Sequence, residues 1–279
     1  MRRIELRGLT FDVRLGGPAD GEPVLLLHGF PQDSGVWSPV SERLHAAGLR
    51  TIAPDQRGYS PGARPEAVAA YRITECVADA VGLLDALEID AAHLVGHDWG
   101  AVAAWQLAGR HPERARTLTA VSVPHPVAAA QAIASDPEQQ QLSSYIALFR
   151  QEGRAEQALL ADGASGLRRM FTESGLSGPQ MEAYVAAASA PGALTAGLNW
   201  YRALSLIDLD GLGPITRPTT YIWGDRDTFF GRFAVERSAE HVTGPYRYVE
   251  LPGMNHWIPE LAPDALADLV VDRALSLPR

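Results

Sequence analysis

The sequence has little cysteine and little excess of basic residues. Cys76 is the single cysteine among 279 residues, so no disulfide bond can form within the chain. It falls in an expected helix over residues 71–87 without the pattern of a reactive thiol, and we expect a small buried side chain. The net charge is −9 and no Lys/Arg-rich run occurs. Nucleic acids and anionic membranes are bound through basic patches, so we expect neither as a partner.

Long apolar runs are also missing. No stretch approaches the ~18 apolar residues of a membrane-spanning helix. The sequence begins with Met1-Arg2-Arg3, but residues 4–7 include an acidic and a basic side chain and do not form the apolar centre of a secretion signal. We therefore expect a cytoplasmic protein with no membrane segment.

What the sequence does contain is an alternation of short apolar runs and helical segments. Strands are expected at residues 3–6, 10–15, 24–27, 49–53, 91–95, 118–123, 219–223 and 246–251. Helices are expected at residues 36–47, 71–87, 101–109 and 264–275. The first two strands form an antiparallel start, and the alternation that follows predicts an α/β fold. Its mostly parallel twisted sheet has helices on both faces.

The pattern changes between residues 126 and 212. This stretch is rich in Ala and Gln at helical spacing, is interrupted by Gly and Pro, and shows no strand pattern. We interpret it as an inserted helical cap over the ends of the strands. Residues 1–125 and 213–279 then form the α/β core, which is long enough to bury a sizeable apolar interior.

The sequence Gly-His-Asp-Trp-Gly at residues 96–100 lies between an expected strand and an Ala-rich helix. This is the layout of a nucleophile elbow, a sharp turn that holds one side chain above the sheet. The two glycines are needed because the strand and the helix approach too closely for a Cβ atom. The best-known elbows carry Ser at the centre, whereas this one carries Asp98. We expect His97 to point away from Asp98 and to be structural.

An aspartate nucleophile indicates a particular chemistry. With an ordinary pKa of ~3.9, the carboxyl of Asp98 is already ionised at neutral pH and needs no base before it attacks. It displaces a leaving group at an sp3 carbon and becomes an alkyl ester. The sequence therefore favours alkyl substrates over acyl transfer.

A histidine and a second aspartate follow later strands. Because parallel strands end at one edge of the sheet, Asp227 and His256 should meet Asp98 there, in the order nucleophile, acid, histidine. Asp225 is the alternative acid, but we favour Asp227 because a few residues beyond the strand are needed to reach the histidine. His256 then takes a proton from the water that attacks the ester. The backbone N–H groups of Trp99 and Phe30 would stabilise the oxyanion.

Together, residues 96–100, His-Gly-Phe-Pro at 28–31 and Asn-His-Trp at 255–257 resemble the epoxide hydrolase and haloalkane dehalogenase branch of the α/β-hydrolase fold family. The resemblance covers essentially the whole chain and is strongest outside the cap. It implies a cis peptide bond between Phe30 and Pro31. We expect neither a cofactor nor a metal.

Epoxide hydrolases of this family carry two cap tyrosines whose hydroxyls hold and protonate the epoxide oxygen. Leu-Asn-Trp-Tyr-Arg at residues 198–202 is similar to the motif of the second, which implies Tyr201. The resemblance implies Tyr145 as the first, with Tyr184 as the alternative. A phenol with a pKa of ~10 stays protonated at neutral pH and therefore suits this role.

We therefore predict an epoxide hydrolase that forms a vicinal diol through an ester on Asp98. A haloalkane dehalogenase, or another hydrolase with the same triad, is the alternative. Trp99 could bind a halide, but Phe30 stands where dehalogenases commonly have Asn. Fluoroacetate dehalogenases have Arg after the nucleophile, where this chain has Trp99. A binding protein without activity is the third hypothesis, and the intact triad argues against it. The expected partners are a small epoxide and water; the epoxide, its stereochemistry and a homodimer are left open.

Overall fold

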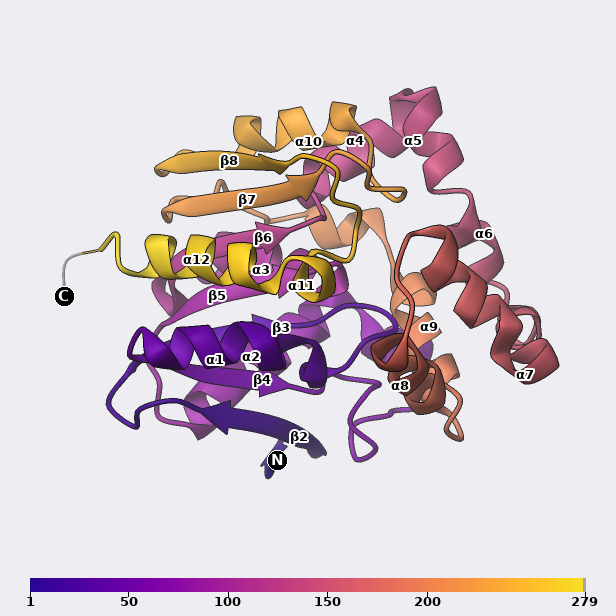
Figure 1. The fold of residues 1–279 in the computed structure, drawn as a ribbon, viewed down its shortest axis with the longest axis horizontal. Helices are drawn as coiled ribbons and strands as arrows, with labels where there is room; N and C mark the ends of the chain where they lie inside the picture. The colour runs from indigo at the N-terminus through magenta and orange to yellow at the C-terminus, as the bar shows by residue number, and fades with distance from the viewer. Residues whose placement is uncertain (278–279) are drawn as a thin grey trace.

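The computed structural model describes residues 1–277, and eight strands in this range form a single sheet. Their order across the sheet is β1-β2-β4-β3-β5-β6-β7-β8 (Figure 1). The strands are β1 (Arg2–Leu6), β2 (Leu9–Gly16), β3 (Glu22–Leu27), β4 (Leu49–Pro54), β5 (Ala92–His97), β6 (Ala115–Val121), β7 (Thr219–Gly224) and β8 (Tyr246–Leu251). β3 to β8 are mutually parallel. β2 runs antiparallel to both of its neighbours, β1 and β4. The predicted mostly parallel sheet is confirmed.

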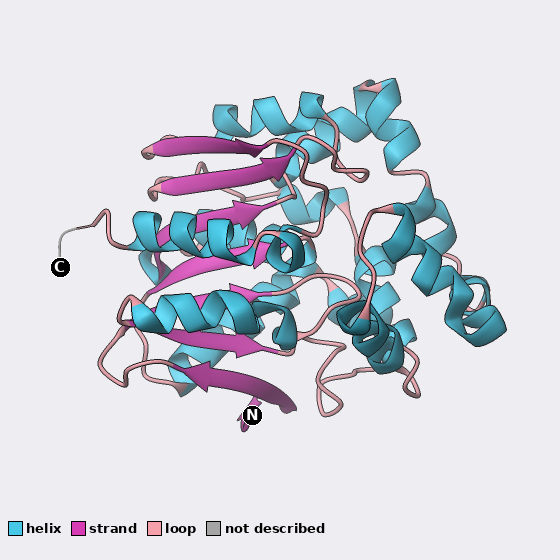
Figure 2. Ribbon diagram, viewed as in Figure 1, coloured by secondary structure: helices cyan, strands magenta, loops and turns pink. Residues whose placement is uncertain are grey.

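Helices cover both faces of this sheet (Figure 2). The helices of the core are α1 (Ser38–Ala46), α2 (Ile73–Ala86), α3 (Trp99–Arg110), α10 (Arg232–Arg237), α11 (Ile258–Leu261) and α12 (Pro263–Ala274). α1, α11 and α12 lie on one face, and α2 and α3 lie on the other (Figure 1). In the part of the chain that the structure describes, no helix is both long and apolar enough to span a membrane.

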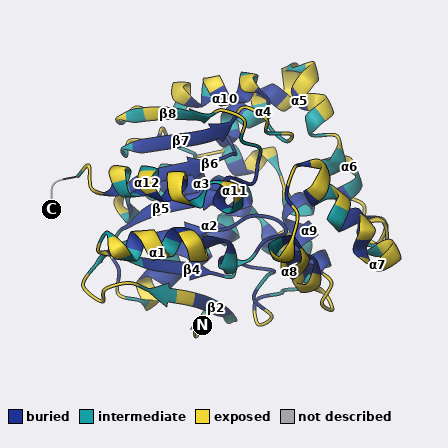
Figure 3. Cartoon of the chain, in the orientation of Figure 1, coloured by how far each residue is buried: buried dark blue, intermediate teal, exposed yellow. Residues whose placement is uncertain are grey.

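The centre of the sheet is covered on both sides, which explains its continuous apolar runs. In β3, residues 24–27 are at most 1% exposed. The inner strands are buried along their length, whereas the helices expose their outer faces (Figure 3). Cys76 lies buried in α2, as its position in an apolar helical pattern predicts. The packed apolar interior therefore fixes the carboxyl ends of the central strands.

Element boundaries differ from the sequence expectation where the backbone turns. The helix expected at 36–47 begins as a 3-10 turn, η1 (Ser34–Trp37), before α1. The helix expected at 71–87 starts at Ile73, because Arg72 is extended, with ψ at 144°. β6 ends at Val121 rather than 123 because Ser122 has φ at 68°, which the strand conformation does not allow.

Residues 126–212 form helices joined by turns and contain no strand, as the sequence pattern predicts. The helices are α4 (Pro126–Ser135), α5 (Pro137–Leu142), α6 (Tyr145–Phe149), α7 (Arg154–Glu173), α8 (Pro179–Ala188), α9 (Ala193–Ala203) and the 3-10 turn η4 (Leu206–Leu209). α6 to α9 lie beyond the edge toward which the parallel strands run (Figure 1). We keep the name cap for residues 126–212.

Candidate active site

Asp98 occupies a strained turn between β5 and α3. Its φ of 53° and ψ of −123° are unusual for a residue with a side chain and typically cost about 1–3 kcal/mol. The turn is tight because a Cβ atom on Gly96 would lie 2.1 Å from the Gly100 carbonyl oxygen. A Cβ atom on Gly100 would lie 2.0 Å from the Leu27 carbonyl oxygen. The surrounding strand and helix therefore hold Asp98 at the sheet edge.

His256 lies between two carboxylates. Its Nδ1 is 2.8 Å from Oδ2 of Asp227, and its Nε2 is 3.5 Å from Oδ2 of Asp98. The other oxygen of Asp227 accepts hydrogen bonds from the backbone N–H groups of Phe229 at 2.7 Å and Phe230 at 3.1 Å. Because the Asp227 side chain is fully buried and bonded on both oxygens, it fixes the imidazole with Nε2 toward Asp98.

Asp225 has a different surrounding from Asp227. It is exposed, and its Oδ1 accepts a hydrogen bond from the backbone N–H of Gly253 at 2.6 Å. This bond joins the turn after β7 to the turn after β8. The structure therefore brings Asp227, and not Asp225, into contact with His256.

The charges in this cluster stabilise one another. Burial by itself lowers the pKa of His256, but the charges of Asp227 and Asp98 and their hydrogen bonds raise it to about 10. Burial raises the pKa of Asp98, but the hydrogen bond and charge of His256 and the N–H of Phe30 hold it below its ordinary value. At neutral pH the site thus contains an Asp98 carboxylate next to a His256 imidazolium.

Two backbone N–H groups lie beside the nucleophile. The N–H of Phe30 donates to Oδ1 of Asp98 at 2.7 Å. Trp99 is the first residue of α3, so its N–H has no partner within the helix. Gly29 allows this approach, because a Cβ atom there would lie 2.3 Å from the Cβ atom of Asp98. The peptide bond between Phe30 and Pro31 is cis, as the resemblance implies.

A cavity of about 540 Å³ opens above Asp98, a size typical of small-molecule sites. Asp98, Trp99, Tyr145 and Tyr201 line it together. Much of the remaining wall is apolar and includes Val102, Ala129, Ala130, Ile146, Leu204 and Phe230. Within residues 1–277, no three or more His, Cys, Asp or Glu side chains are grouped so as to hold a metal ion.

The two cap tyrosines come from separate helices, α6 and α9. The rings of Tyr145 and Tyr201 are 6.1 Å apart, and Phe149 packs against both, at 5.1 Å and 5.0 Å. The ring of Tyr201 also packs edge-to-face on Trp99 at 5.1 Å. Burial raises the pKa of both phenols above their ordinary value. Both hydroxyls are therefore protonated at neutral pH and available as donors.

Tyr184, the alternative cap tyrosine, is not among the residues that line this cavity. Its hydroxyl accepts a hydrogen bond from Gln180 at 2.8 Å and lies beside Glu260 of α11. It is buried between α8 and the loop that carries His256. The structure therefore places Tyr145 and Tyr201 next to Asp98, and Tyr184 behind the histidine.

His97 contacts two polar groups behind the site. Its Nδ1 is 3.0 Å from Oε1 of Gln32, and its Nε2 is 2.8 Å from the carbonyl oxygen of His256. Gln32 in turn donates to Glu260 at 2.5 Å. The sequence analysis missed Gln32 and Glu260. The sequence did offer a weak signal for both residues. Gln32 is a polar residue directly after the His-Gly-Phe-Pro motif, and Glu260 is an acidic residue four positions after His256.

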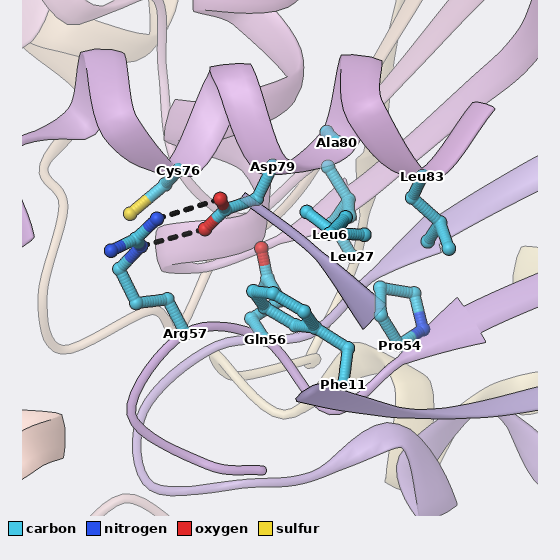
Figure 4. Close-up of a pocket in the computed structure, with 10 residues that line it drawn as sticks. All are labelled: Leu6, Phe11, Leu27, Pro54, Gln56, Arg57, Cys76, Asp79, Ala80 and Leu83. Carbon is cyan, nitrogen blue, oxygen red and sulfur yellow. Dashed lines mark hydrogen bonds and ion pairs between the residues drawn. The ribbon is translucent and has the colours of Figure 1, made fainter. Parts of the chain in front are cut away.

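A second, much smaller cavity of about 20 Å³ lies between α2 and the loop after β4 (Figure 4). It has room for about one water molecule and not for a substrate. The buried guanidinium of Arg57 makes two contacts of 2.6 Å with the carboxylate of Asp79 there. Breaking a buried pair typically costs about 3–5 kcal/mol. This pair anchors the loop whose Arg57 carbonyl accepts a hydrogen bond from the Trp200 indole, next to Tyr201.

Comparison with known proteins identifies the fold first. The profile of the α/β hydrolase fold family matches residues 22–263. The AB hydrolase superfamily protein YfhM of Bacillus subtilis is 34% identical, over 96% of each chain. Epoxide hydrolase A of Mycobacterium tuberculosis is 33% identical, over 94% of this chain and 93% of its own.

Solved structures agree. The crystal structure of epoxide hydrolase A from Mycobacterium thermoresistibile superposes with a TM-score of 0.86 at 30% identity, covering 99% of this chain and 98% of the other. An inhibitor complex of the Bacillus megaterium epoxide hydrolase superposes with a TM-score of 0.88 at 25% identity, covering 98% and 100%. The chain belongs to the α/β hydrolase fold family and, within it, to the epoxide hydrolase branch. The resemblance drawn from the sequence motifs is confirmed.

Proposed function

We propose that this protein is an epoxide hydrolase that opens an epoxide to a vicinal diol through a covalent ester on Asp98. One observation carries the proposal. The carboxylate at the elbow and the hydroxyl-bearing rings of Tyr145 and Tyr201 line one cavity, with the pair of His256 and Asp227 directly behind the carboxylate. The nucleophile, the acid for the leaving oxygen and the base for water are thus within one site.

In the first step, an oxygen of Asp98 forms a bond to one epoxide carbon. The bond between that carbon and the ring oxygen breaks, and its electron pair goes to the oxygen. Tyr145 or Tyr201 donates a proton to this oxygen, with the second phenol as a hydrogen-bond donor. The raised pKa of both phenols keeps them protonated for this role. The product is a hydroxyalkyl ester of Asp98.

In the second step, water hydrolyses this ester. Once Asp98 is esterified, its negative charge is lost, and one of the causes that raise the pKa of His256 disappears. The imidazolium then releases its proton more readily, and this proton restores the phenol that was ionised in the first step. The neutral imidazole takes a proton from water as the water attacks the carbonyl carbon of the ester, and the N–H groups of Phe30 and Trp99 stabilise the oxyanion. The oxyanion collapses, the bond to the substrate oxygen breaks, and this oxygen takes a proton from His256 to complete the diol. The proton of the new Asp98 carboxyl then passes to His256, which restores the starting state.

The cavity wall indicates the kind of epoxide. Apart from the catalytic groups, much of the wall consists of the apolar side chains of α3, α4, α6 and the segment after α9. The wall also includes Arg150 and Asp208, but apolar side chains make up most of it, and an apolar substituent that packs against them leaves water. We therefore propose substrates with an apolar substituent on the epoxide ring.

The test is to trap the ester. The variant His256→Gln is mixed with styrene oxide and other apolar epoxides, and its intact mass is measured. We expect a mass increase equal to one epoxide, located on the peptide that contains Asp98, while the wild type forms diol. The matched control Asp98→Asn should gain no mass. Absence of both adduct and diol across the panel contradicts the proposal.

A haloalkane dehalogenase would use the same triad, and the Trp99 indole is the feature that favours it. However, the indole interacts with the Tyr201 hydroxyl, and Phe30 offers no side-chain donor for a halide. The two activities differ in their need for the phenols. Release of halide from haloalkanes that is unaffected by Tyr201→Phe would support the dehalogenase.

A further inference from the structure

A chain of buried polar groups lies behind the triad, and the proposed mechanism does not use it. It begins at Glu260 in α11, four residues after His256. Oε1 of Glu260 accepts a hydrogen bond from Nε2 of Gln32 at 2.5 Å. Oε2 is buried and has no hydrogen-bond partner. A carboxyl in such a place is costly, so its surroundings need an explanation.

The side chain of Gln32 connects Glu260 to two backbone segments of the site. Its Oε1 accepts from the N–H of Gly29 at 3.2 Å and faces Nδ1 of His97 at 3.0 Å. Gly29 directly precedes Phe30, whose N–H holds Asp98. His97 in turn contacts the carbonyl oxygen of His256 at 2.8 Å. The amide of Gln32 is thus linked to two segments of the site. One is the turn at residues 28–31, which we call the oxyanion turn, and the other is the loop at residues 252–257, which we call the histidine loop.

The hydrogen-bond partners of this chain fix the orientation of the Gln32 amide. The N–H of Gly29 needs an acceptor, so the amide oxygen of Gln32 faces it and the NH2 group faces Glu260. Oε1 of Glu260 accepts from this NH2 group whether the carboxyl is ionised or carries a proton on Oε2, which has no other partner. The contact therefore requires an acceptor oxygen at this position and not a negative charge.

The groups around Glu260 come from every element packed against it. Gln32 approaches from the loop after β3, the Tyr184 hydroxyl from α8, and the imidazolium of His256 from the histidine loop, with Asp33 near Tyr184. Burial raises the pKa of Glu260 to about 7, although the hydrogen bond from Gln32 and the charge of His256 lower it. Both protonation forms are therefore populated near neutral pH.

We propose that Glu260 is a positioning residue for ester hydrolysis, which holds the oxyanion turn and the His256 backbone in place through Gln32 and His97. The inference rests on the proposed function. Hydrolysis uses both segments, because His256 activates the water and the N–H of Phe30 stabilises the oxyanion. Formation of the ester uses only one of them, the turn whose Phe30 N–H holds Asp98. Loss of the Glu260 acceptor should therefore slow the second step more than the first.

Two variants separate charge from hydrogen bonding. Glu260→Gln keeps an acceptor oxygen for Gln32 but does not ionise. Glu260→Ala leaves the buried NH2 group of Gln32 without a partner, which we expect to slow ester hydrolysis about tenfold or more. Glu260→Gln should keep a rate of hydrolysis within about threefold of the wild type, because its side-chain oxygen still accepts from Gln32. The conservative variant should thus rescue the loss that Glu260→Ala causes.

The experiment is a single-turnover reaction with styrene oxide, sampled by rapid quench from about pH 6 to about pH 9. Intact mass gives the ester, and chromatography gives the diol, so both steps are measured. We expect ester formation to slow by a smaller factor than hydrolysis in Glu260→Ala, and to stay within about twofold of the wild type in Glu260→Gln. The exposed Glu66 provides the matched control, Glu66→Gln, which should match the wild type in both steps.

The inference is overturned if Glu260→Gln slows hydrolysis as much as Glu260→Ala does, if Glu260→Ala hydrolyses the ester at the wild-type rate, or if both steps slow by the same factor. Circular dichroism and the melting temperature show whether each variant folds. If Glu260→Ala does not fold, Gln32→Leu, which removes the donor of the same contact, takes its place in the comparison with Glu260→Gln. Failure of the proposed function has a different outcome, because the wild type itself would then form neither ester nor diol.

Discussion

The core and the cap hold their site residues in different ways. In the core, Asp98 is held by a strained turn, and Asp227 and His256 by short directional hydrogen bonds near the ends of strands. In the cap, Tyr145 and Tyr201 are held mainly by ring packing. Hydrogen bonds fix an orientation more narrowly than apolar contacts do. Directional hydrogen bonds thus hold the site residues of the core, whereas ring packing holds those of the cap.

The two regions meet at defined contacts. The Trp200 indole donates to the Arg57 carbonyl at 2.8 Å, and the Trp257 indole donates to the Ser174 hydroxyl at 2.7 Å. The first hydrogen bond joins α9, the helix that carries Tyr201, to the loop after β4. The second joins the residue after His256 to the end of α7. Under the proposed mechanism, His256 and Asp227 of the core serve ester hydrolysis, and the cap tyrosines serve ester formation. Variants at these two sets of residues should therefore affect different steps.

The largest expected effect is the loss of the nucleophile. Asp98→Asn places a neutral amide at the elbow, which does not attack an epoxide carbon, so diol formation should fall on the order of 10⁴-fold or more. Diol is measured by chromatography, and circular dichroism checks the fold. Retention of more than about a hundredth of the activity would show that the core does not supply the nucleophile.

The next effect tests the carboxylate behind the histidine. Asp227→Asn removes the charge that orients and stabilises the imidazolium, so ester hydrolysis should slow on the order of 10³- to 10⁴-fold. Ester should accumulate, because the attack by Asp98 does not use this group. Single-turnover mass measurements follow both steps. Equal slowing of the two steps would break the division between core and cap.

A smaller effect is expected in the cap, and in the opposite step. Tyr201→Phe and Tyr145→Phe each remove one proton donor, so ester formation should slow about 10- to 100-fold while hydrolysis of an ester already formed is unchanged. Tyr246→Phe, at a partly buried tyrosine on the edge strand β8 away from the cavity, is the matched control. Because burial raises the pKa of both phenols, ester formation should also persist as the pH rises to about 10.

The smallest expected effect distinguishes the two aspartates after β7. Asp225→Ala removes only an exposed turn contact with Gly253, so the free energy of unfolding should fall by about 1 kcal/mol and the rate by less than about threefold. Urea denaturation and steady-state rates measure both. A loss as large as that of Asp227→Asn would assign the orienting role to Asp225.

The sequence was sufficient for the core because its signals are local. Gly96 and Gly100 mark a turn that only glycine allows, and each of Asp98, Asp227 and His256 follows a recognisable strand. Parallel strands end at one edge, so residues distant in sequence meet without any knowledge of packing. The strand pattern, the helical cap and the choice of Asp227 over Asp225 as the neighbour of His256 all followed from such signals.

Only the tertiary structure decided which cap tyrosine faces the nucleophile and what lies behind the histidine. Tyr145 and Tyr184 both sit on helices, and the rotation and placement of a helix depend on its packing partners rather than on its own sequence. The contact between Gln32 and Glu260 joins the loop after β3, near the start of the chain, to helix α11, near its end. No periodic pattern encodes such a pair, because its geometry exists only once the sheet and both loops are assembled.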